Sequence, residues 1–173
     1  VQLRTIVGEM FDLMYEAKGI GLAANQVALP YRVFVMNATG DPNEKDEEHV
    51  FLNPEILTKK GSIEGEEGCL SLPELYGSVP RADQIVVSAF DLSGQEFEMT
   101  LKDLPSRVVQ HENDHLDGVL FIDRVSESTL RDLLPHLEDF EQRFRRDQKA
   151  GIIPENEALE KKLKSLEPRE PGS

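Results

Sequence analysis

Apolar residues near the start of the chain recur at steps of three and four residues, from Leu3 to Ala17. This period predicts an amphipathic helix whose apolar stripe packs in the core. Further along, short apolar runs bounded by turn residues predict strands. The predicted strands are Tyr31–Ala38, Val50–Leu57, Gln84–Asp91 and Glu96–Leu101. Ser93 and Gly94 predict a hairpin turn between the last two strands, and Thr39–Glu48 is predicted to be a solvated acidic loop.

A second helical period follows the last predicted strand. Leu104, Val108, His111 and His115 repeat at i, i+4, i+7 and i+11, which predicts a helix with these four side chains on an inward-facing stripe. Gly118 then predicts the helix stop, because glycine readily takes the left-handed conformation that follows a helix end.

A last long helix is predicted after a short apolar run at Val119–Ile122. Ser126 or Ser128 can cap its start, and Pro135 marks either a break or its true first turn. Its apolar face is formed by Leu137, Phe140 and Phe144, and its basic end by Arg143, Arg145, Arg146 and Lys149.

Composition changes at Ala150, after which Pro, Glu, Lys and Gly dominate. We expect one domain over residues 1–149 and an acidic C-terminal extension over residues 150–173. Within the extension, Ala158–Leu166 predicts a short exposed helix and Glu167–Ser173 a disordered tail.

The composition narrows the function classes. The 173 residues suffice for one domain with a real core, and the formal net charge of −14 argues against wholesale binding of DNA, other nucleic acid or anionic membranes. No apolar run approaches the roughly 20 residues that span a bilayer. The single cysteine excludes an internal disulfide and fits a reducing compartment, so a cytoplasmic protein is expected.

Candidate chemistry lies on the second helix, in the run from His111 through Glu112 to His115. Two imidazoles four residues apart share one helix face and can bind one metal ion, and the glutamate beside them can act on metal-bound water. The alternative is a pair of core histidines bonded to the backbone, which needs no metal.

A catalytic metal site needs a third protein ligand, and spacing alone leaves it open. The position that metzincin proteases use for a third histidine holds Phe121. Glu138 lies about twenty residues on, where thermolysin-like proteases place a glutamate, so a zincin-type metallopeptidase is one hypothesis. Cys69 is another candidate, because a thiolate binds Zn²⁺ or Fe²⁺ strongly.

Three blocks together resemble the peptide deformylase family, in the family's order: Gly19–Gln26, Glu67–Ser71 and Gln110–Gly118. The resemblance covers roughly Leu3 to Arg124. It implies an α+β fold of mostly antiparallel sheets wrapped around a central metal-binding helix, with an N-terminal helix and a C-terminal helix. It also implies the family's activity, which is removal of the formyl group from the N-terminal formyl-methionine of newly made polypeptides, with release of formate.

The resemblance assigns site residues position by position. The implied metal ligands are Cys69, His111 and His115. The implied catalytic groups are the carboxylate of Glu112, as general base and acid toward metal-bound water, and the formyl-polarising Gln26 amide and Leu70 backbone N–H. The implied substrate-binding residues are Ile20, Gly21, Glu67, Arg81, Leu104 and Val108. Among these, Glu67 and Arg81 match an ion pair beside the site, and Leu104 and Val108 match the methionine pocket.

The resemblance also implies a cofactor and partners. One divalent ion is expected, Fe²⁺ in the cell, with Zn²⁺, Ni²⁺ or Co²⁺ able to replace it. The expected protein is a monomer of the bacterial cytoplasm that acts on formyl-Met nascent peptides. The basic end at residues 143–149 could contact ribosomal RNA, or it could be a solvated helix end.

The sequence departs from the family pattern in two places. Members usually have a strand-containing segment before the first helix, and this chain begins near that helix. Arg107 stands where some members have an apolar residue beside the pocket, and its head group is expected to extend into solvent.

Overall fold

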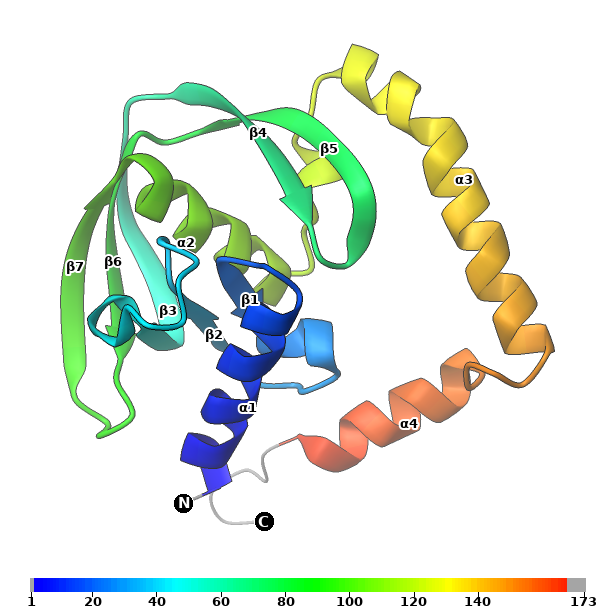
Figure 1. Ribbon diagram of the computed structural model, residues 1–173, viewed down its shortest axis with the longest axis horizontal. Coiled ribbons are helices and arrows are strands. Elements are labelled where there is room, and N and C mark those ends of the chain that lie inside the picture. The colour runs from blue at the N-terminus through cyan, green and yellow to red at the C-terminus, as the bar shows by residue number, and fades with distance from the viewer. Residues whose placement is uncertain (1, 168–173) are drawn as a thin grey trace.

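The computed structural model describes residues 2–167. Its helices are α1 (Gln2–Glu16), α2 (Asp103–Leu116), α3 (Glu127–Lys149) and α4 (Asn156–Leu166). Its strands are β1 (Gly21–Ala23), β2 (Val33–Met36), β3 (His49–Lys60), β4 (Ile63–Cys69), β5 (Leu72–Arg81), β6 (Gln84–Phe90) and β7 (Glu96–Lys102). Short 3₁₀ turns are η1 (Ala24–Val27), η2 (Lys45–Glu47) and η3 (Phe121–Asp123). The α+β fold expected from the sequence is confirmed (Figure 1).

A five-stranded antiparallel sheet, in the order β1-β2-β3-β6-β7, packs between the first two helices. Strand β2 is buried on both faces. Phe34 and Met36 join the cluster that includes Val108 and Val109 of α2, whereas Val33 and Val35 join the cluster with α1. All four strands predicted from the apolar runs are present, and β3 runs on to Lys60 because its end still pairs with β6.

A second, two-stranded sheet of β4 and β5 covers the other side of α2 (Figure 1). Strands β1, β4 and β5 were absent from the prediction. In β5 the buried positions alternate from Leu75 onward as a strand requires, but two of them are Gly77 and Arg81, which carry no apolar signal. This hairpin packs on η3 and α3 through a third core cluster that includes Leu75, Val79 and Phe121.

Helix α2 ends as predicted. Gly118 has φ +73°, its N–H donates to the His115 carbonyl, and the Val119 N–H donates to the Asp114 carbonyl, which together form a Schellman motif. The predicted inward stripe is correct for Val108 and His115, but Leu104 is 47% exposed. That part of the expectation was wrong because the first turn of α2 borders an open cavity rather than the core.

Helices α3 and α4 lie outside this body (Figure 1). The Ser126 hydroxyl accepts a hydrogen bond from the Thr129 N–H, so the capping prediction is confirmed for Ser126. Pro135 neither breaks α3 nor begins it, because the helix continues through this residue to Lys149. The predicted exposed helix at residues 158–166 is present as α4, and the predicted tail lies, past Glu167, outside the described residues. Across residues 2–167, none of the helices combines the length and apolar composition that crossing a bilayer requires.

Candidate metal centre

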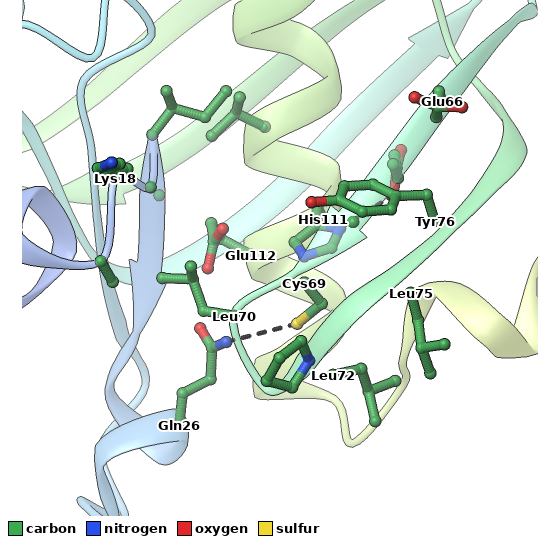
Figure 2. Close-up of a pocket in the computed structure, with 18 of the residues that line it drawn as sticks. Lys18, Gln26, Glu66, Cys69, Leu70, Leu72, Leu75, Tyr76, His111 and Glu112 are labelled. Carbon is green, nitrogen blue, oxygen red and sulfur yellow. Dashed lines mark hydrogen bonds and ion pairs between the residues drawn. The ribbon is translucent and has the colours of Figure 1, made fainter. Parts of the chain in front are cut away.

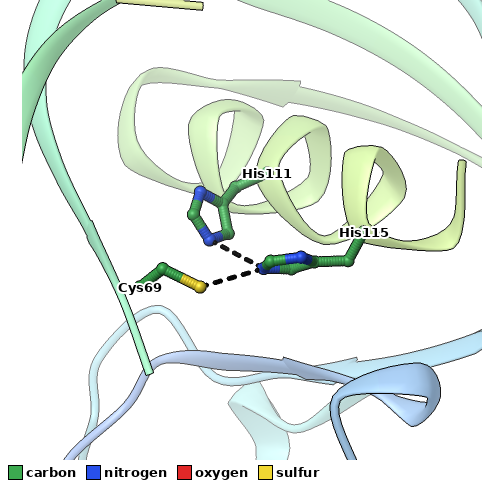
Figure 3. Close-up of side chains that lie close together, drawn as sticks. All are labelled: Cys69, His111 and His115. Atoms are coloured by element: carbon green, nitrogen blue, oxygen red, sulfur yellow. Dashed lines mark hydrogen bonds between the residues drawn. The ribbon is translucent and has the colours of Figure 1, made fainter. Parts of the chain in front are cut away.

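Three candidate ligands meet where the β4–β5 hairpin faces α2. Cys69 is the last residue of β4, at a register shift after Gly68, and His111 and His115 lie on successive turns of α2. The Cys69 Sγ and His115 Nε2 atoms are 3.2 Å apart, and the two histidine Nε2 atoms are also 3.2 Å apart (Figure 3). These three donor atoms lie within 4.8 Å of one another. Cys69 is therefore the third ligand candidate that the geometry supports.

The donor set fits a divalent transition metal. Two nitrogens that bind a tetrahedral zinc ion at ordinary distances lie roughly 3.3 Å apart, close to the spacing seen here. The His111 Nδ1 atom lies 2.9 Å from the Glu67 carboxylate, which fixes the ring so that Nε2 faces the cluster. Three protein ligands leave one tetrahedral position for solvent or substrate, as in catalytic rather than structural sites.

The electrostatics of the cluster favour an anionic sulfur. Burial raises the pKa of the Cys69 thiol, but hydrogen bonds from His111 and His115 outweigh burial and lower that pKa to about 5. Burial likewise lowers the pKa of His111, while its bonds to Cys69 and Glu67 raise it to about 10. The surroundings of Cys69 therefore favour the thiolate, which is the form that binds a metal.

Glu112 lies beside this cluster but is not one of the three candidate ligands (Figure 2). Its side chain is buried, and its Oε2 atom has no hydrogen-bond partner among residues 2–167. Burial raises the pKa of this carboxyl to about 7, where a group can both accept and donate a proton. Gly21 makes room for it, because a Cβ atom at position 21 would lie 2.8 Å from the Glu112 carboxyl carbon.

Gln26 presents its amide nitrogen to the same cluster. Its Oε1 atom accepts a hydrogen bond of 2.9 Å from the Ala23 N–H, which orients the amide. Its Nε2 atom donates to the Cys69 sulfur at 3.6 Å (Figure 2). The same atom donates to the Ser71 hydroxyl at 3.0 Å. A hydrogen-bond donor is therefore fixed next to the candidate ligands.

One cavity of about 680 Å³ connects these groups. It is lined by all the site residues expected from the sequence except His115 and Arg81, namely Ile20, Gly21, Gln26, Glu67, Cys69, Leu70, Leu104, Val108, His111 and Glu112. His115 belongs to the cluster itself, and Arg81 lies behind Glu67. The structure therefore brings all twelve expected residues to one place.

The Glu67–Arg81 ion pair expected from the sequence is present and buried. The two side chains form two parallel hydrogen bonds of 2.9 Å. Burial raises the pKa of Glu67, but its bonds to Arg81 and His111 lower it to about 2. The expectation for Arg107 was wrong: its head group bonds Glu67 instead of extending into solvent, and its side chain is 12% exposed.

Asp114 is a site residue that the sequence analysis did not assign. It is buried on the same helix as both histidines and pairs with Arg81 and with Arg124. The available signal was its position three residues after His111, which places a carboxylate on the covered side of the helix. Together these pairs extend the charge network from the cluster to the segment before α3.

Comparison with known proteins agrees with this geometry. The family model described as polypeptide deformylase matches residues 1–131. The chain belongs to the polypeptide deformylase family. Peptide deformylase of Rhodopirellula baltica is 49% identical over 158 residues, which cover 91% of this chain and 78% of that protein. Peptide deformylase of Acidobacterium capsulatum is 47% identical, over 87% of this chain and 84% of that protein.

Solved structures of deformylases share the fold. Peptide deformylase 1B of Arabidopsis thaliana has a TM-score of 0.81 at 40% identity and covers 91% of this chain and 87% of its own. A deformylase from Legionella pneumophila has a TM-score of 0.74 at 40% identity, with 84% of each chain covered. The hypothesis of a zincin-type peptidase is not favoured, because the chain belongs to the deformylase family, Glu138 is exposed on α3, and Cys69 lies with the two histidines.

Proposed function

We propose that this chain is a peptide deformylase that hydrolyses the N-formyl group of formyl-methionine on newly made polypeptides. The observation that supports it most is one cavity that combines a three-ligand cluster with a buried carboxylate oxygen for which the described part of the chain offers no hydrogen-bond partner. A structural metal site would need a fourth protein ligand and no such carboxylate. Within residues 2–167 the cluster contains three candidate ligands.

Glu112 is the proposed general base and general acid. Cys69, His111 and His115 would hold a divalent cation, which would lower the pKa of a bound water molecule and polarise the formyl oxygen. The Glu112 carboxylate takes the proton of the attacking water and returns it to the leaving amine nitrogen, so formate and a free N-terminus are released. Burial raises the pKa of this carboxyl above its ordinary value, which makes the carboxylate a stronger base.

Gln26 and Leu70 are the proposed oxyanion donors. The Gln26 Nε2 group already points at the cluster, and Leu70 follows Cys69 in the chain and lines the cavity. Their N–H groups would bond the oxygen on which negative charge develops, and loss of one such donor typically costs about 10²–10³ in kcat.

The remaining expected residues hold the substrate or orient a ligand. We infer that Ile20 and Gly21 pair with the substrate backbone, since β1 begins at Gly21 and both residues line the cavity. Leu104 and Val108 offer apolar surface on the same wall for the methionine side chain. Glu67, held by Arg81, orients His111.

Formate release tests the proposal directly. Purified protein loaded with a divalent metal is expected to release formate from formyl-Met-Ala-Ser, and removal of the metal by a chelator is expected to stop it. Re-addition of metal should restore the activity, whereas acetyl-Met-Ala-Ser serves as the substrate control. Metal-loaded protein that releases no formate would contradict the proposed function.

For the metal itself we propose Fe²⁺ in the cell, with Zn²⁺, Ni²⁺ or Co²⁺ as replacements. A thiolate with two imidazoles binds all of these ions, and the thiolate donates more charge than a third imidazole would. Metal analysis of protein purified without oxygen, together with formate release for each ion, tests the assignment. Zinc alone in such a preparation would contradict it.

We also propose that one chain acts alone in the cytoplasm, with residues 1–149 as the catalytic domain. The cluster and cavity are complete within residues 17–115, and the described core clusters include no residue after Phe140. Truncation after Lys149 should therefore retain formate release, and sedimentation should give the mass of a monomer.

A ribosome contact through the end of α3 is the proposed partner interaction. Arg143, Arg145, Arg146 and Lys149 are all exposed there. Cations on one helix end can bind RNA phosphates, in contrast to the acidic remainder of the chain. Replacing these four residues by alanine is expected to weaken co-sedimentation with ribosomes, whereas replacing Lys59, Lys60 and Lys102 is not. Unchanged co-sedimentation of the first variant would contradict the ribosome contact and mean that these residues form only a solvated helix end.

A further inference from the structure

Arg107 ties helix α2 to both strands of the hairpin that carries Cys69. Its Nη1 group donates to Glu67 Oε1 at 2.7 Å and to the Val79 carbonyl at 2.9 Å. Its Nη2 group donates to the Ile63 carbonyl at 2.7 Å. One side chain of the metal-binding helix therefore bonds the start of β4, the end of β4 and the facing part of β5.

The bond to Glu67 connects Arg107 with a candidate ligand. Oxygen Oε1 of Glu67 accepts from Arg107 and from Arg81, while Oε2 accepts from Arg81 and faces His111 Nδ1. The Glu67 side chain is 5% exposed, so each of its lone pairs depends on a protein donor. Loss of one donor would leave a buried carboxylate oxygen under-satisfied and free to turn.

Arg81 does not duplicate this contact. It lies on β5, so its pair with Glu67 is made within the hairpin, and it reaches α2 through Asp114. Arg107 precedes His111 by one helical turn, and Asp114 follows it by about one turn. The hairpin is thus bonded to α2 on both sides of His111, and the bond made by Arg107 is the one next to the cavity.

Gly65 permits the close approach of strand and guanidinium. A Cβ atom at position 65 would lie 2.8 Å from the Arg107 guanidinium carbon, nearer than Cβ atoms come to other atoms. Strand β4 therefore lies directly on the Arg107 head group, four residues before Cys69.

We propose that Arg107 is a positioning residue that holds Cys69 at a fixed distance from His111 and His115, and so sets how slowly the bound metal leaves. This inference rests on the proposed metal centre and adds to it a residue that neither ligates nor touches the metal. Charge-assisted bonds to a buried carboxylate and to two strand carbonyls give such a side chain both strength and direction.

The test measures metal release and not hydrolysis. Protein loaded with Zn²⁺ is mixed with a chromophoric chelator at a temperature where every variant is folded by circular dichroism. Arg107→Met, which keeps the length and apolar stem but has no donors, is expected to release Zn²⁺ about tenfold faster than the unmodified chain. Arg107→Lys, with one charged donor group, is expected to lie between the two.

Matched variants separate positioning from general stability. Arg4→Met removes another arginine that donates to a carbonyl, away from the cavity, and should leave the release rate unchanged. If Arg107 acts through Glu67, the effects of Arg107→Met and Glu67→Gln on the release rate will be less than multiplicative in the double variant. Gly65→Ala displaces the guanidinium without removing it and should also speed release.

The outcomes are distinct. Release from Arg107→Met and from Gly65→Ala at the unmodified rate would overturn the inference, whatever their melting temperatures. If Arg107→Met does not fold, Gly65→Ala and Arg107→Lys still decide it by the same measurement. Formate release by the unmodified chain is scored separately, so failure of the proposed activity and failure of the Arg107 inference cannot be confused.

Discussion

Glu112→Gln is expected to lower kcat for formate release by roughly 10²–10⁴-fold while the protein still binds its metal. The substitution keeps the shape of the side chain beside Gly21 and removes only its ability to take and return a proton. Because Glu112 lies outside the Cys69, His111 and His115 cluster, the ligands remain in place.

The measurement pairs steady-state formate release with metal content per chain. Glu138→Gln is the control, because it makes the same chemical change on the exposed face of α3. It should change neither quantity. Loss of metal from Glu112→Gln would mean that the carboxylate helps to bind the ion, and an unchanged kcat would remove it from the proton transfers.

The parts of this molecule that depend on local sequence were predictable. The period of α1, the end of α2 at Gly118 and the cap at Ser126 each depend on a few neighbouring residues, and each is present. The pair His111 and His115 was equally accessible, since four residues separate successive turns of any helix.

Features that depend on tertiary contacts were not predictable in the same way. Arg107 was expected to extend into solvent, because nothing near it in the sequence shows that Glu67 and the Ile63 carbonyl lie within reach. Asp114 received no role, because its partners Arg81 and Arg124 lie on other segments. Both residues belong to a buried network that forms only once the β4–β5 hairpin has packed against α2.

The third ligand could not be assigned from residue spacing and was assigned from the family resemblance. From His111 and His115 alone, Glu138 and Cys69 remained open as partners, because the chain between a helix and a distant ligand can follow many paths. The three blocks shared with the deformylase family favoured Cys69, and the hairpin places its sulfur 3.2 Å from His115 Nε2. Ile20, Gly21 and Gln26 reach the same cavity from a third segment.

Cys69→Ala is expected to lower affinity for Zn²⁺ by more than about 100-fold, beyond what loss of an outer partner costs, and to abolish formate release. Two histidines alone leave the cation with only two protein ligands, both neutral, whereas the thiolate supplies a third ligand and a negative charge. The removed sulfur is small and lies at a strand end, so the core cluster with Leu72 and Leu75 should persist. Metal content after dialysis measures the loss of affinity, and circular dichroism shows whether the fold persists.

Cys69→Asp separates the loss of charge from the loss of sulfur. An aspartate keeps an anionic ligand, so it should recover part of the metal content that Cys69→Ala loses. Formate release that returns with the metal would show that the site needs an anion at this position and not sulfur itself. Metal retained by Cys69→Ala after dialysis would contradict the ligand set, because two imidazoles would then suffice or another side chain would have to take the place of the thiolate.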